Sequence, residues 1–176
     1  MKNLLTLVLS SLLVTTPWTK GDSAALNTRL DLIEIGTALG RIMRKVRTGR
    51  QREAVKDMRI VILEVAFDGK FRERDFVKIL DAASKFCAVM KAETKPSRKS
   101  MAALEMFMVE TLVQILRTHE HLYPRRLAVR EEAWEEKLLR VHNFLILPRT
   151  SIDPVKYSEA WSEMLDVVES AKELLE

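Results

Sequence analysis

Apolar residues recur three and four positions apart along most of this 176-residue chain. That spacing places them on one side of an α-helix, which has about 3.6 residues per turn. The chain holds only five Gly and five Pro, so few positions would interrupt such helices. Short apolar runs such as VILEVAF (61–67) have the composition of a strand, yet each continues a helical stripe. The sequence therefore predicts an all-α protein.

The pattern predicts six helices. The first has its apolar positions between Leu32 and Val46 and is expected to end near Gly49. The second, from Val55 to Val65, is apolar nearly all round, so we expect it to be the most buried helix, closed by Gly69. The remaining four are expected over residues 76–90, 101–122, 127–145 and 154–175.

Three of these helices carry start signals. Asp153 followed by Pro154 matches a capping residue before the first helical position. Ser97 or Ser100 is suited to cap the helix over 101–122, and Pro124 is suited to open the next one. Because the connections are short, neighbouring helices should run antiparallel. The prediction is a single helical domain over residues 24–176, a bundle of about six antiparallel helices, preceded by an apolar segment over residues 1–23.

The apolar segment 1–23 has two interpretations. Its single Lys2, the apolar run from Leu4 to Val14 and the breaker Pro17 resemble a secretory signal, and the run is too short to span a bilayer. In the other interpretation it is an amphipathic helix of the working protein. The first, which the pattern slightly favours, predicts a secreted or membrane-associated protein, and the second predicts a cytoplasmic one.

A cluster of basic residues surrounds the expected turn at Thr48-Gly49. Guanidinium groups beside a helix N-terminus suit anionic partners, because both donate hydrogen bonds to oxygen anions. Only Glu53 and Asp57 interrupt the cluster. Its members, the candidate contacts for an anion or partner, are Arg41, Arg44, Lys45, Arg47, Arg50, Arg52, Lys56 and Arg59.

Two further charge patterns bear on this cluster. A second basic group, Lys91, Lys95, Arg98 and Lys99, flanks Pro96, and Arg125, Arg126 and Arg130 follow later; the fold decides whether they share a surface with the first. Residues 1–130 hold 24 Lys and Arg against 14 Asp and Glu, whereas residues 131–176 hold 5 against 11. The acidic C-terminal part would therefore either neutralise the basic cluster or leave it free for an anionic partner.

The sequence predicts no metal site and no cofactor. His119 and His121 point about 200° apart on a helix, and we expect them to be exposed residues of a helix end. The single Cys87 lies on an apolar stripe, where a buried structural thiol is expected. Phosphate-loop, dinucleotide-binding and nucleophile-elbow patterns are absent.

These observations predict a non-enzymatic helical interaction protein that binds another macromolecule, as an accessory or effector-type factor does. A protein partner is the first expectation. The alternative is binding of a nucleic acid or an anionic membrane through residues 41–59, although no aromatic side chain stands among them to stack on bases. A helical enzyme would require Glu or His side chains from several helices to converge in one pocket.

Overall fold

The computed structural model describes residues 22–123, 131–146 and 151–176, and in these ranges all of the regular secondary structure is helical. The all-α prediction is thus confirmed. The apolar segment up to residue 21, the predicted helix start at Pro124 and the arginines 125, 126 and 130 lie outside the described residues. The helices are α2 (Asp22–Met43), α3 (Gly49–Asp68), α4 (Glu73–Lys91), α5 (Arg98–Phe107), η1 (Met108–Leu112), α6 (Val113–Leu122), α7 (Glu131–Ile146) and α8 (Pro154–Glu173).

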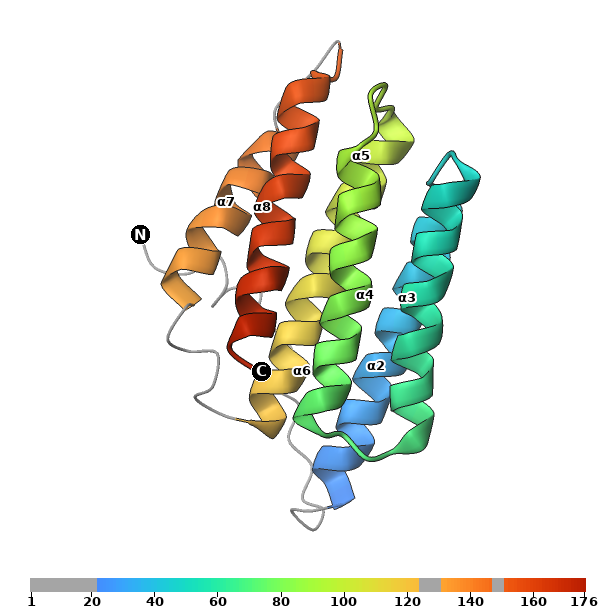
Figure 1. Cartoon of the computed structure of the whole chain (residues 1–176), viewed down its shortest axis with the longest axis vertical. Helices are drawn as coiled ribbons and strands as arrows, with labels where there is room; N and C mark the ends of the chain where they lie inside the picture. The colour runs from blue at the N-terminus through green and yellow to red at the C-terminus, as the bar shows by residue number, and fades with distance from the viewer. Residues whose placement is uncertain (1–21, 124–130, 147–150) are drawn as a thin grey trace.

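Six rods result, because α5, η1 and α6 follow one another without a break, and successive rods run antiparallel as predicted. They form two layers (Figure 1). One layer holds α8, α4 and α3, and the other holds α7, the α5–α6 rod and α2. None of the described helices is both long and apolar enough to cross a membrane.

Aromatic side chains fill the space between the two layers. Trp161 of α8 is fully buried, and its ring lies 5.4 Å from the rings of Phe86 on α4 and Phe107 on α5. Phe86 and Phe107 also contact each other, at 5.0 Å between ring centroids. Buried aromatic pairs add to the stability that burial of their surface provides. This cluster therefore connects three helices at the centre of the bundle.

The prediction that the helix over Val55–Val65 is the most buried one is wrong. In α3, Ile60 and Phe67 are 43% and 69% exposed. The more buried helix is α4, which lies between α3 and α8 in its layer. An edge helix can carry apolar residues on several sides and still bury only those that face the bundle, so apolar content alone did not give its position.

The helix ends largely follow the start and stop signals. Asp153 caps α8 by accepting from the Val155 amide at 2.9 Å, and Gly69 ends α3 with φ at 68°. Ser97, not Ser100, is the residue that caps α5. The first predicted helix differs: it ends at Met43, while Gly49 begins α3 because Thr48 and Gln51 form a capping box there.

The helix predicted over 101–122 contains an irregularity that no signal announced. Residues Met108–Leu112 form a π-helical turn in its middle. Such turns insert one residue into the helical repeat and change which side chains face the core on either side. Glu110 of this turn forms an ion pair with Arg41 of α2. The turn thus directs a carboxylate towards the first basic cluster.

Candidate basic interface

The two basic groups of the sequence meet at one end of the bundle. The α2–α3 turn and the α4–α5 turn both lie at this end (Figure 1). Arg47 of the first turn donates through Nη1 to the backbone oxygen of Lys95 in the second, at 3.0 Å. The second basic group therefore shares a surface with three members of the first, Lys45, Arg47 and Arg50.

A groove of about 470 Å³ lies between the two turns. Val89 and Ala92 give it an apolar part, and the cations Arg47, Arg50 and Lys95 line its sides. The N-termini of α3 and α5 open at the same end and add positive partial charge. We call the following set the basic end: Lys45, Arg47, Arg50, Lys91, Lys95, Arg98 and Lys99; all but the half-buried Lys45 are exposed.

One carboxylate, that of Glu93, lies among these cations and holds the end together. It accepts hydrogen bonds from Gln51 on α3 at 3.2 Å, from Ser100 on α5 at 2.9 Å and from Tyr157 on α8 at 3.2 Å. Burial raises the pKa of Tyr157 far above its ordinary value of 10.0, so the phenol keeps the proton that it donates. Sequence analysis missed this network, although Glu93 is the only acidic residue between positions 91 and 100.

The first basic cluster does not act as one patch. Arg41 is paired with Glu110, and Arg59 donates to the backbone oxygen of Gly36 at 3.0 Å. Lys45, Arg47 and Arg50 belong to the basic end. The other three, Arg44, Arg52 and Lys56, are exposed and form no hydrogen bond or ion pair with any described residue through their side chains.

The acidic C-terminal helices do not neutralise the basic end. Among the described residues, three carboxylates of α7 and α8, those of Glu136, Glu163 and Asp166, pair with cations of α7, and a lysine of α8 pairs with α4. The shortest such contacts are Arg140 with Glu136 (2.7 Å) and Glu163 (2.8 Å), Lys137 with Asp166 (2.7 Å) and Lys172 with Asp81 (2.7 Å). In the part of the chain that the structure describes, none of these carboxylates pairs with a cation of the basic end.

Acid should weaken the contact between α7 and α8. The hydrogen bond from Arg140 lowers the pKa of Glu163 below its ordinary value of 4.5. A lowered pKa contributes stability above the unfolded value, and that contribution is lost as pH falls through the folded value. We expect Glu163→Gln to be less stable than wild type at pH 7, with the difference shrinking below about pH 4.5. Urea denaturation across this pH range measures the difference in stability between the two proteins. A difference that does not change with pH would contradict a lowered pKa for Glu163.

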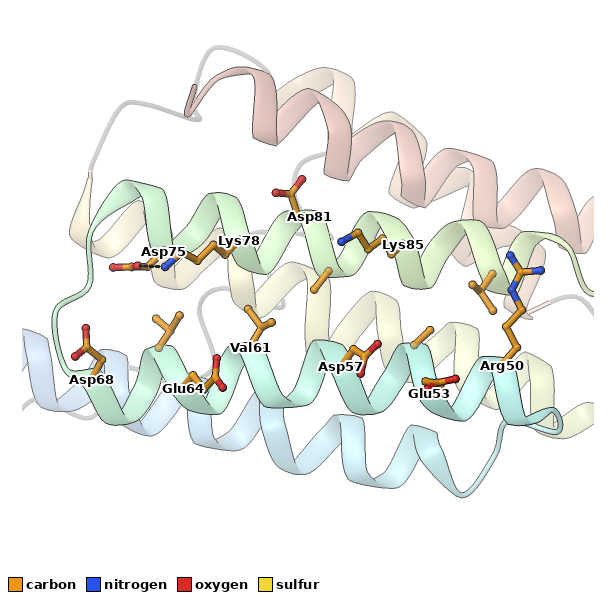
Figure 2. Close-up of a pocket in the computed structure, with 14 residues that line it drawn as sticks. Arg50, Glu53, Asp57, Val61, Glu64, Asp68, Asp75, Lys78, Asp81 and Lys85 are labelled. Atoms are coloured by element: carbon orange, nitrogen blue, oxygen red, sulfur yellow. Dashed lines mark hydrogen bonds and ion pairs between the residues drawn. The ribbon is translucent and has the colours of Figure 1, made fainter.

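A second, larger groove of about 680 Å³ runs between α3 and α4. Figure 2 shows that acidic side chains from both helices border it, with Asp75 paired to Lys78 at 3.1 Å. On α3 its carboxylates are those of Glu53, Asp57, Glu64 and Asp68. The side of α3 that faces α4 is thus acidic, whereas Arg52 and Lys56 stand outside this groove.

The histidine and cysteine predictions have mixed outcomes. His119 is buried, contrary to expectation, and its ring packs against Phe76 and Tyr123 at 5.2 and 5.0 Å. His121 is exposed. Cys87 is a buried free thiol as predicted, and burial raises its pKa well above 9.0. Within the described ranges, no three His, Cys, Asp or Glu side chains are grouped so as to hold a metal ion.

No protein-family model matches this chain, and no curated protein and no solved structure matches it either.

Proposed function

We propose that this protein is a non-enzymatic interaction protein that binds an acidic segment of a partner protein through its basic end. The observation that carries the proposal is the Arg47–Lys95 hydrogen bond, which joins two basic turns around one groove. Three cations line this groove beside one carboxylate, and that carboxylate, Glu93, already accepts three hydrogen bonds. An anionic partner would therefore meet positive charge on each side of the groove.

Two features favour a protein partner over a nucleic acid. The groove has a volume of about 470 Å³, enough for a few side chains, and the residues that line it include the apolar Val89 and Ala92. None of the residues lining it is aromatic, whereas binding of single-stranded nucleic acid usually relies on aromatic stacking. An acidic peptide with small apolar residues would match both the positive charge of the groove and its apolar lining residues.

The test is binding of a fluorescent poly-Glu peptide of about ten residues, followed by anisotropy at several NaCl concentrations. We expect Arg50→Glu with Lys95→Glu to weaken binding by at least about tenfold at low salt, and wild-type binding to weaken as salt is added. The first of these substitutions places a carboxylate in the first turn of α3, which now has none, so the variant should fold.

The matched control is Lys70→Glu with Arg74→Glu, which makes the same change in net charge at the opposite end of α4. Both side chains are exposed. If the control loses as much affinity as the basic-end variant, net charge rather than the groove drives binding and the proposal is wrong. The proposal is equally wrong if the wild-type protein does not bind the peptide, or if the wild-type protein binds a DNA oligonucleotide of the same charge more tightly than the peptide.

A further inference from the structure

The outer side of the α2–α3 hairpin carries two parallel stripes that sequence analysis did not connect. On α2, helical spacing places Leu26, Leu30 and Ile33 on one side, and Arg44 follows in the turn just after the helix ends at Met43. On α3, the same spacing aligns Arg52 and Lys56 with a run of apolar residues, Ile60, Leu63 and Phe67. The stripe on α3 is therefore apolar in the C-terminal half of the helix and basic in the N-terminal half, and α2 adds apolar residues in its N-terminal half and a cation just after its C-terminal end.

The packing of the hairpin brings the two apolar halves together. Arg29 of α2 donates through Nε to the backbone oxygen of Ala66 at 3.1 Å. Further along, Leu63 lies against Gly36 so closely that a Cβ there would come within 2.8 Å of its Cδ2. The N-terminal half of α2 thus pairs with the C-terminal half of α3. Both apolar halves lie at one end of the hairpin, and the three cations lie at the other.

The apolar half is open to solvent. Leu26 is 55% exposed, Leu30 50%, Ile60 43% and Phe67 69%. Four large apolar side chains on two adjacent helices are more than the scattered single ones that a soluble surface usually carries. We call the whole set, Leu26, Leu30, Ile33, Arg44, Arg52, Lys56, Ile60, Leu63 and Phe67, the hairpin face.

Acidic side chains of these helices line the surfaces next to the hairpin face. Four of them, Glu53, Asp57, Glu64 and Asp68, line the α3–α4 groove, which adjoins the hairpin face because Glu64 stands one helical turn from Ile60. On α2, Asp31 interacts with Thr118 and His121 of α6, and Glu34 lies beside it. Among the described residues, none of these carboxylates forms an ion pair with Arg44, Arg52 or Lys56.

We propose that the hairpin face binds the surface of an anionic lipid bilayer, with the apolar half entering the headgroup region and the basic half contacting lipid phosphates and carboxylates. Peripheral helices bind in this way when apolar side chains and lysines or arginines share one side. A second copy of the chain fits less well, because the charged residues of its own hairpin face, Arg44, Arg52 and Lys56, are all cations. This inference concerns a different surface from the basic end and does not rest on the proposed function.

The experiment is co-sedimentation of the full chain with phosphatidylcholine vesicles, with and without about 30 mol% phosphatidylserine. The apolar variant is Leu30→Ser with Phe67→Ser, and its control is Leu139→Ser with Ile146→Ser, two residues of α7 that are 46% and 61% exposed. The basic variant is Arg52→Glu with Lys56→Glu, and its control is Arg50→Glu with Lys95→Glu at the basic end. All variants keep residues 1–21, so any contribution of that segment is common to them, and circular dichroism verifies that each is folded.

We expect wild type to prefer the vesicles that contain phosphatidylserine. The apolar variant should bind them at least about tenfold more weakly, while its α7 control binds as wild type does. The basic variant should lose at least about tenfold on the anionic vesicles and only slightly on phosphatidylcholine alone. A smaller loss in the basic-end control would locate the lipid contact on the hairpin face.

Three results would overturn the inference. The first is wild type that sediments equally with both vesicle types or with neither. The second is an apolar variant that binds as wild type does, which would leave only non-specific charge attraction. The third is a wild-type dimer that Leu30→Ser with Phe67→Ser dissociates, because the face would then belong to a second copy. These vesicle and dimer measurements do not depend on whether the poly-Glu peptide binds to the basic end.

Discussion

Replacing Trp161 with alanine is expected to lower the free energy of unfolding by about 3–5 kcal/mol. The indole is fully buried and contacts the rings of Phe86, Phe107 and Tyr157. Its removal would leave a cavity where α4, α5 and α8 meet, and the surrounding aromatic rings cannot close it without leaving their own contacts. The loss combines transfer of the indole to water with the cost of that cavity.

Urea denaturation followed by far-UV circular dichroism measures this effect. The control is Phe67→Ala, another aromatic truncation, at a side chain that is 69% exposed. It should change the free energy of unfolding by no more than about 0.5 kcal/mol. If both variants lose the same free energy of unfolding, the aromatic cluster between the layers contributes less to stability than its burial indicates.

The architecture could be predicted because one physical signal repeats through the chain. The spacing of apolar residues such as Ile35, Leu39 and Ile42 is sufficient to define a helix and the side that it buries. Local capping chemistry likewise marked the starts of α5 and α8. These signals depend on residues that are close together in the sequence, so they can be recognised without knowledge of the tertiary contacts.

Predictions that depend on tertiary contacts were less successful. Ile60 and Phe67 lie off the buried stripe of a helix that is apolar nearly all round and was expected to be the most buried, yet they are exposed because α3 lies at the edge of its layer. His119 matches the pattern of an exposed helix end, yet Phe76 of α4 and Tyr123 cover it. The π-helical turn at Met108–Leu112 has no local marker either. In each case the neighbouring helix, rather than the local sequence, decides the outcome.

The candidate site was predicted as a run of sequence, and the fold divides it. Arg47 and Arg50 join the second basic group at the bundle end, whereas Arg52 and Lys56 lie on the hairpin face. Charge counting cannot make this division, because it depends on the antiparallel packing of α2 on α3. The network around Glu93 was missed for the same reason: its three donors come from α3, α5 and α8.

Replacing Glu93 with alanine is expected to lower the free energy of unfolding by at least about 2 kcal/mol, since hydrogen bonds to a charged group contribute about 1.5–3 kcal/mol each. The largest part should come from Tyr157, whose hydroxyl would be left buried without its acceptor. The matched control is Glu105→Ala on α5, an exposed glutamate whose side chain forms no hydrogen bond or ion pair with a described residue. It should change stability by less than about 0.5 kcal/mol.

Glu93→Gln separates the structural role of this side chain from its charge. The amide keeps an acceptor oxygen for Tyr157 or Ser100, so it should cost less stability than alanine does. It also removes the one carboxylate among the cations of the basic end, so the poly-Glu peptide should bind this variant more tightly than wild type, and more clearly so at low salt. Denaturation and peptide anisotropy on the same samples test both expectations. Weaker peptide binding by a Glu93→Gln variant of near wild-type stability would show that the carboxylate itself takes part in recognition, and that positive charge alone does not explain the groove.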